Sequence, residues 1–207
     1  LSYSLTVNSG LGGSATGSGT YNYGNTPSIT ASPSAGHAFL SWSGSGVTNP
    51  SSASTTVSMT GTRTVTANFQ PLSYALNLTA GTGGSVTGSG NFTHGQTPSI
   101  TATAGTGYVF SSWSGDGVVN PASASTTVNM TQARSVSASF VPATYALSLT
   151  SGSGGSVGGE GVYSHGSTPI ITATPNTGYS FSSWSGSGVT NPGNPTTTVS
   201  MTQPRDI

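Results

Sequence analysis

The sequence predicts an all-β fold made of three small tandem modules, and an internal repeat is the first reason. One pattern recurs at a spacing of 71 residues without a gap. The recurring residues are Tyr3, Tyr74 and Tyr145; Trp42, Trp113 and Trp184; Met59, Met130 and Met201; and Arg63, Arg134 and Arg205. A fixed period of this kind indicates repeated structural units. We place repeat 1 at residues 1–71, repeat 2 at 72–142 and repeat 3 at 143–207.

The second reason is the alternation of apolar and polar residues within each repeat. In repeat 2, Tyr74, Leu76 and Leu78 alternate with smaller or polar residues. Successive side chains of a strand point to opposite faces, so this pattern is typical of strands with one buried face. Gly, Pro or Asn bound the runs, as at the ends of short strands. We expect about six short strands per repeat, in a β-grasp-like fold or a small sandwich.

A repeat of this size needs its aromatic residues for a core. The chain has no cysteine, so no disulfide supports a domain that is near the lower size limit for independent folding. An aromatic side chain that buries 150–250 Å² contributes roughly 4–6 kcal/mol before entropy is subtracted. The predicted core of repeat 2 consists of Tyr74, Leu76, Phe92, Ile100, Phe110, Met130 and Phe140.

The role of the three tryptophans stays open at this level. In strict alternation Phe110 and Trp113 point to opposite faces, unless a bulge intervenes. Trp42, Trp113 and Trp184 then pack on loops of their own repeat, on the next repeat, or on a sugar ring. We favour packing, because small domains usually need large aromatic residues in the core. The alternative is a carbohydrate-binding array with a polysaccharide partner.

Composition argues against several classes of protein. The chain has three basic and three acidic residues, and it lacks the basic clusters that hold a phosphate backbone or an anionic lipid surface. No apolar run has the length of a membrane span. We therefore expect neither nucleic-acid binding nor membrane insertion. Ser and Thr make up about a third of the residues, so we expect the chain to be glycosylated, assembled, or both.

No group of residues predicts catalysis, a metal site or a cofactor site. The acids Asp116, Glu160 and Asp206 are isolated and share no offset between repeats. One histidine per repeat, with no cysteine and few carboxylates, cannot complete a tetrahedral metal shell. The arginines do share an offset, at the start of the last strand. We interpret them as solvated strand-end charges that discourage edge pairing.

Two further features concern the joints and the last repeat. The joints at residues 70–73 and 141–144 are short and contain proline, which restricts the swing of one repeat on the next. We expect a semi-rigid rod on the order of 70–100 Å long. Repeat 3 lacks the closing aromatic that repeats 1 and 2 carry at Phe69 and Phe140. Either the natural chain continues, which we favour, or another subunit adds a strand there.

Several motifs together resemble the divergent InlB B-repeat, also called the bacterial repeat domain of the Listeria–Bacteroides repeat group. In repeat 2 they are YALNL from Tyr74, GGSV from Gly83, NFTHG from Asn91, SITA from Ser99, GYVFSSW from Gly107 and SASF from Ser137. The resemblance covers the whole chain and implies small all-β modules, in tandem, on large secreted or surface-attached bacterial proteins. It brings no catalytic residues.

We therefore expect a structural repeat region that is extracellular or on the cell surface and is not an enzyme. Its expected role is that of a stalk, an adhesin or an extracellular filament subunit. The expected partners are other repeats or subunits of the same protein.

Overall fold

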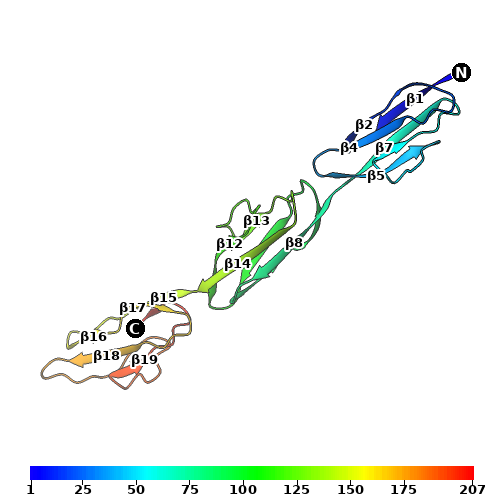
Figure 1. The fold of residues 1–207 in the computed structure, drawn as a ribbon. Coiled ribbons are helices and arrows are strands. Elements are labelled where there is room, and N and C mark those ends of the chain that lie inside the picture. Colours follow the sequence, from blue (N-terminus) through cyan, green and yellow to red (C-terminus); the bar gives the residue numbers. More distant parts are fainter. The chain divides into compact units, whose positions relative to one another are not determined.

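The protein folds entirely into β-strands and turns. A computed structural model describes residues 1–207 and contains no helix (Figure 1). Close packing divides the chain into two compact units. The first comprises Leu1–Asn77, Ser89–Ser99 and Thr127–Ser135, and the second comprises Leu78–Gly88, Ile100–Thr126 and Val136–Ile207. Repeat 1 lies wholly in the first unit and repeat 3 wholly in the second, so these two repeats define the module.

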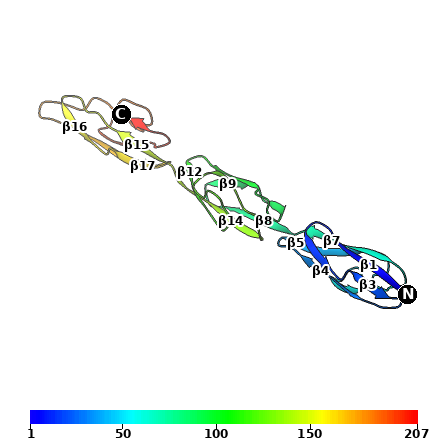
Figure 2. The same cartoon turned by 90° about the horizontal axis from the view of Figure 1, so that it is seen from above.

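Repeat 1 shows the complete module, which has two sheets. Its strands are β1 (Ser2–Ser9), β2 (Gly13–Thr16), β3 (Gly19–Asn22), β4 (Ser28–Pro33), β5 (His37–Gly44), β6 (Ser54–Thr56) and β7 (Arg63–Pro71). One sheet has the order β3-β1-β7-β5 and the other has the order β2-β4-β6. Figure 2 shows β3 beside β1. Of the paired strands, only β1 and β7 run parallel.

This arrangement confirms the all-β expectation and selects the small sandwich over the β-grasp-like fold, because no helix packs on either sheet. The module has seven strands, one more than expected. The chain crosses from one sheet to the other between β2 and β3. These two neighbouring strands therefore do not form a hairpin with each other, and each belongs to a different sheet.

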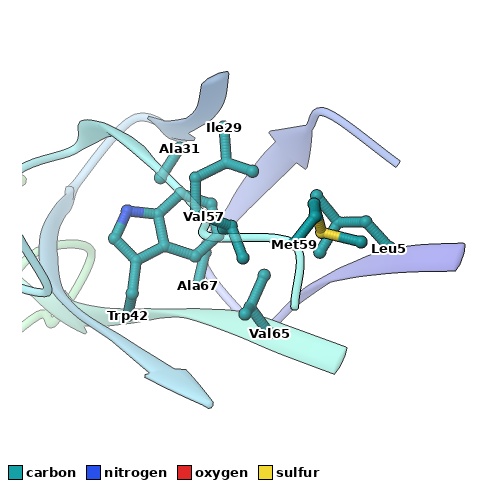
Figure 3. Close-up of a cluster of buried hydrophobic side chains, with 8 residues drawn as sticks. All are labelled: Leu5, Ile29, Ala31, Trp42, Val57, Met59, Val65 and Ala67. Atoms are coloured by element: carbon teal, nitrogen blue, oxygen red, sulfur yellow. The ribbon is translucent and has the colours of Figure 1, made fainter. Parts of the chain in front are cut away.

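The core of repeat 1 lies between its two sheets (Figure 3). On β4, Ile29 and Ala31 are buried while Ser28 and Thr30 are exposed, which is the alternation that the sequence shows. Removing such apolar surface from water stabilises the fold by about 25 cal/mol per Å². The buried side chains are Leu5, Ile29, Ala31, Trp42, Val57, Met59, Val65 and Ala67.

A β-bulge in the strand that carries the tryptophan changes the expected direction of that side chain. The pairing of β5 with β7 shifts register between Phe39 and Ser41, which leaves Leu40 unpaired. The extra residue cancels the alternation, so Phe39 and Trp42 pack together with ring centroids 5.8 Å apart. Strict alternation, which places these two rings on opposite faces, is therefore wrong for this strand.

Repeat 2 has the same succession of strands. They are β8 (Ser73–Ala80), β9 (Gly84–Thr87), β10 (Gly90–Thr93), β11 (Ser99–Ala104), β12 (Tyr108–Ser114), β13 (Ser125–Thr127) and β14 (Arg134–Pro142). The bulge recurs between Phe110 and Ser112, and the rings of Phe110 and Trp113 again lie 5.8 Å apart. The sequence period is thus also a structural period.

Residues 143–207 of repeat 3 form six strands. Its strands are β15 (Thr144–Ser148), β16 (Gly155–Gly158), β17 (Gly161–Ser164), β18 (Ile170–Pro175), β19 (Thr196–Thr198) and β20 (Arg205–Asp206). They form two three-stranded sheets, β17-β15-β20 and β16-β18-β19. β20 has two residues where β7 has nine, and residues 179–184 are in no strand.

Candidate functional site

The three tryptophans lie inside their repeats. Trp42, Trp113 and Trp184 are 4%, 3% and 7% exposed. Each indole Nε1–H donates a hydrogen bond of 3.0 Å to a carbonyl oxygen of the loop that follows its strand, on Ser52 for Trp42 and on Ser123 for Trp113. The sequence allows each tryptophan to pack on a loop of its own repeat, on the next repeat or on a sugar. In the structure, each indole hydrogen-bonds to a loop of its own repeat. The rings of Trp42 and Trp113 are buried, whereas Trp184 also contributes to the wall of a cavity in repeat 3.

The predicted core residues of repeat 2 fall into two groups. Leu76, Ile100 and Met130 are buried. The aromatic members are half-buried; they are Tyr74, Phe92, Phe110 and Phe140. In repeat 1 the aromatic residues at the same offsets pack around the edge of the buried cluster. Aliphatic side chains therefore form the centre of the module, and the aromatic rings other than tryptophan surround it.

The predicted core residues do not include one set of central residues. Val57, Val128 and Val199 are fully buried, and each stands two positions before a fully buried methionine. The sequence feature that marks these valines is the recurring Val-x-Met pair. It contains no aromatic residue, unlike the Phe and Trp motifs.

The arginines do not act as free charges at a sheet edge. Arg63 begins β7, and β7 lies between β1 and β5 in the sheet, so it is not an edge strand. The guanidinium of Arg63 donates hydrogen bonds to the Ser58 carbonyl oxygen at 3.3 Å, to Ser45 Oγ at 2.8 Å and to Thr60 Oγ1 at 2.6 Å. It therefore holds two loops to the start of the central strand, and the edge-protection interpretation is wrong.

Arg205 repeats this arrangement in repeat 3. Its guanidinium donates to the Ser200 carbonyl oxygen at 3.2 Å, to Ser187 Oγ at 2.6 Å and to Thr202 Oγ1 at 3.1 Å. The recurrence at a spacing of two repeats indicates a structural role for this position.

We expect replacement of Arg63 by methionine to destabilise repeat 1 by about 1–2 kcal/mol, because hydrogen bonds to neutral loop acceptors are lost while the apolar stem is kept. Thermal unfolding followed through the amide signals of repeat 1 measures the change. Arg63→Lys, which keeps the charge without the planar fork, should restore only part of it. Equal stability of Arg63→Met and the unchanged protein would show that these hydrogen bonds do not matter.

Titratable side chains do not gather anywhere in the molecule. No three His, Asp or Glu residues lie close enough to hold a metal ion, and no cysteine is present. His37 covers the glycine turn of its own repeat, where a Cβ at Gly12 would collide with the imidazole. His94 and His165 lie at the joints between repeats.

The joints are the second place where the structure repeats a specific set of contacts. β7 ends at Pro71 and β8 begins at Ser73, so a single residue, Leu72, separates the last strand of one repeat from the first strand of the next. The Leu72 N–H donates to the Gly36 carbonyl oxygen at 2.8 Å, and the Leu72 carbonyl oxygen accepts from the His94 N–H at 2.8 Å. All of these residues belong to the first compact unit.

The joint between repeats 2 and 3 has the same contacts, and they lie within the second compact unit. Ala143 separates β14 from β15; its N–H donates to the Gly107 carbonyl oxygen at 2.8 Å, and its carbonyl oxygen accepts from the His165 N–H at 2.7 Å. One linker residue thus bonds to a turn of the repeat before it and to a strand end of the repeat after it.

Each joint also packs an imidazole ring on a glycine. A Cβ at Gly36 would collide with the His94 ring, and a Cβ at Gly107 would collide with the His165 ring. Both rings also contact a tyrosine edge-on, with centroids 6.0 Å apart for Tyr74 and His94. The Nδ1 atoms of both histidines are buried without a hydrogen-bond partner, so these rings contribute packing at that atom and no hydrogen bond.

At the same offsets outside the two joints, the corresponding residues are uncovered. Gly178, which corresponds to Gly36 and Gly107, has nothing within 4 Å of its Cβ position. Tyr23, which corresponds to His94 and His165, is 62% exposed. The comparison shows that the contacts at Gly36 and Gly107 come from the adjoining repeat.

Comparison with known proteins identifies the repeats. The family described as the divergent InlB B-repeat domain matches the chain three times, over residues 3–73, 74–144 and 145–207. Repeats of this family are typically non-catalytic and occur in surface or secreted bacterial proteins. A search of curated proteins finds none that matches the chain. No helix in the structure has the length and apolar character that crossing a membrane requires.

Proposed function

Because the chain belongs to the divergent InlB B-repeat family, we propose that it is a spacer, a structural repeat region that holds other parts of a bacterial surface or secreted protein apart. The observation that carries this proposal is the joint that recurs at Leu72 and Ala143. A chain that served only to tether domains would not need the same hydrogen bonds and the same imidazole–glycine contact at each junction. Among the expected roles, this feature favours the stalk over the adhesin and the filament subunit.

The physical argument rests on the freedom that each joint removes. A flexible linker lets its flanking domains sample many orientations. Here one residue joins two strands, and its N–H and carbonyl oxygen are both bonded, to Gly36 and His94 in the first joint. The dihedral angles of that residue are therefore constrained from both sides. We infer that successive repeats keep a preferred orientation, as a spacer requires.

The surface chemistry fits a role without catalysis. The three acidic and three basic residues are spread over a chain whose surface is rich in neutral hydroxyl groups. Asp116 and Glu160 are exposed, and neither has a hydrogen-bond partner that would orient it for proton transfer. We propose that the protein acts through its length and not through a reaction, and that its hydroxyl groups carry sugar in the native material.

Distances between spin labels test the spacer proposal. The chain has no cysteine, so cysteines placed at the equivalent exposed positions Ser14 and Ser85 are the only labelling sites. We expect one narrow distance distribution between the two labels. A matched variant with six Gly and Ser residues inserted after Leu72 should give a broad distribution. If the unaltered joint gives a distribution as broad as the insertion variant, the repeats are merely tethered and the proposal fails.

A further inference from the structure

Repeat 2 contains a short sequence pattern three times. Residues 77–79, 91–93 and 129–131 read NLT, NFT and NMT, so each is an asparagine followed, two positions later, by a threonine. An asparagine in this pattern, with any residue except proline in the middle, is an acceptor for a sugar on its side-chain amide. The pattern also identifies such segments as surface segments of a secreted protein.

The other two repeats lack this pattern. The residues that stand at the positions of the three asparagines are Thr6, Thr20, Ser58, Ser148, Val162 and Ser200. In both repeats the pattern comes close to forming once more, but a proline occupies its middle position, in NPS from Asn49 and in NPT from Asn194. The chain thus contains three acceptor patterns and two patterns that proline blocks.

In two of the three patterns, strand geometry places the amide and the hydroxyl group on one exposed face. In β8, Asn77 and Thr79 are exposed while the leucine between them is half-buried. In β10, Asn91 and Thr93 are exposed while the phenylalanine between them is half-buried. Successive side chains of a strand point to opposite faces. The middle residue therefore packs inward, and the asparagine and the threonine stand side by side in solvent.

These two asparagines are also neighbours across the sheet. Asn91 pairs with Ala75 in the antiparallel pairing of β10 with β8, and Asn77 follows Ala75 by two residues on the same face. Diagonal neighbours of this kind lie about 7–8 Å apart. Neither strand contains a charged residue. The outer face of β8 and β10 therefore presents two acceptor amides together.

The third asparagine is exposed within a buried run. Val128 and Met130 are fully buried, and Asn129 between them is exposed. Thr131 is exposed, and its Oγ1 accepts a hydrogen bond of 3.0 Å from the Arg134 guanidinium. The hydroxyl proton of Thr131 is thus still available for donation.

The three side-chain amides are not used to hold the fold of their own unit. Asn77, Asn91 and Asn129 all belong to the first compact unit, and none of their side chains forms a hydrogen bond within it. Other asparagines of that unit are used: Asn68 Nδ2 donates to Ser41 Oγ at 3.4 Å. A sugar on the three amides would therefore displace no such contact.

We propose that Asn77, Asn91 and Asn129 are attachment sites for N-linked sugar. The co-substrate is a sugar whose anomeric carbon carries a diphosphate ester, and a glycosyltransferase catalyses the transfer. The Nδ2 atom of the asparagine attacks the anomeric carbon, so that a C–N bond forms and the C–O bond to the diphosphate breaks. The amide proton passes to a base of the transferase, and the diphosphate leaves on its nucleoside or lipid carrier.

This inference is separate from the spacer proposal and from sugar on hydroxyl groups. It concerns amide nitrogen atoms, and it assigns this modification to repeat 2 alone. An array of any function could carry it. Failure of the spacer proposal would leave it intact, and its own failure would leave the joints unaffected.

Mass spectrometry of peptides from the protein isolated from its native source tests the proposal. Alkaline treatment first eliminates sugars from serine and threonine and leaves sugars on asparagine in place. Fragmentation that keeps the sugar on the peptide then locates it. We expect sugar on Asn77, Asn91 and Asn129 and none on Asn49 or Asn194, whose patterns contain proline. Bare amides at the three positions, or sugar on either of the two control asparagines, would overturn the proposal.

The composition of the attached sugar separates the two kinds of donor. A single sugar at each site would identify a nucleoside diphosphate carrier, and the same oligosaccharide at every site would identify a lipid carrier. Both results support the modification, because the bond to Nδ2 is the same.

A matched pair of variants, made in the native source, tests the part played by the hydroxyl group. Thr79→Ser keeps this group, whereas Thr79→Val keeps the branched shape that suits a strand and loses it. We expect Asn77 to keep its sugar in Thr79→Ser and to lose it in Thr79→Val, while Asn91 keeps its sugar in both. Thr93→Val should give the reverse result for the two asparagines. Sugar retained on Asn77 in Thr79→Val would contradict the proposed acceptor pattern.

Discussion

Replacement of Trp42 by alanine is expected to unfold repeat 1 at ambient temperature or close to it. The indole is buried between the two sheets, and its Nε1–H satisfies the Ser52 carbonyl oxygen. Truncation of a buried tryptophan to alanine costs about 3–5 kcal/mol. The total stability of a small domain is about 5–15 kcal/mol, and a module of this size belongs at the lower end of that range. Amide signals followed through a thermal scan give the midpoint of each repeat separately.

Two comparisons make this prediction specific. Trp42→Phe keeps much of the buried area and loses the hydrogen bond, so its midpoint should lie between those of the alanine variant and the unchanged chain. Repeat 3 should keep its midpoint in both variants, because its core is built from its own residues around Trp184. If the thermal midpoints of all three repeats fell together, the cores would be coupled. If the midpoint of repeat 1 did not change, the tryptophan would not be needed for its stability.

Replacement of Gly107 by alanine is expected to open the joint between repeats 2 and 3. Gly107 has a φ of 79°, where a residue with a side chain is strained by about 1–2 kcal/mol. Its Cβ would also collide with the His165 ring, so the ring must leave its place. The consequence is loss of the hydrogen bonds at Ala143. Spin labels at Ser85 and Ser156 should report a broader distance distribution, and the amide of His165 should exchange faster with solvent.

Gly178→Ala is the control for backbone strain. Gly178 stands at the same offset, has a φ of 85°, and has nothing within 4 Å of its Cβ position. The two variants therefore share the strain and differ only in the collision with the imidazole. Both should lose some thermal stability, while only Gly107→Ala should broaden the distance distribution. Identical distributions in the two variants would show that the imidazole–glycine contact does not set the orientation of the joint.

The period and the alternation of residues were enough to predict the modules and their all-β fold. Both features are local in sequence: the spacing of Tyr3, Tyr74 and Tyr145 marks the repeats, and Ile29 with Ala31 shows the buried face of a strand. They predict the type of element without the order of the strands in the sheets. That order depends on the parallel pairing of β1 with β7, which lie at opposite ends of the repeat.

The features that sequence analysis could not place all depend on such distant contacts. The strand-end position of Arg63 predicts an edge role, because nothing local in the sequence shows that β7 lies inside its sheet. The bulge at Leu40 arises from the register between β5 and β7, and it reverses the side on which Trp42 lies. His94 and His165 share an offset, but the glycines that they cover belong to the preceding repeat and stand more than fifty residues earlier.

Mechanical unfolding of single molecules tests the central claim most directly, namely that each repeat is stabilised by its own core. Pulled from its two ends, the chain should give three separate unfolding events. Each complete repeat of 71 residues should release up to roughly 230–260 Å of chain at about 3.3–3.6 Å per residue, less its folded length. One event for the whole chain, or two events that divide repeat 2, would contradict the account.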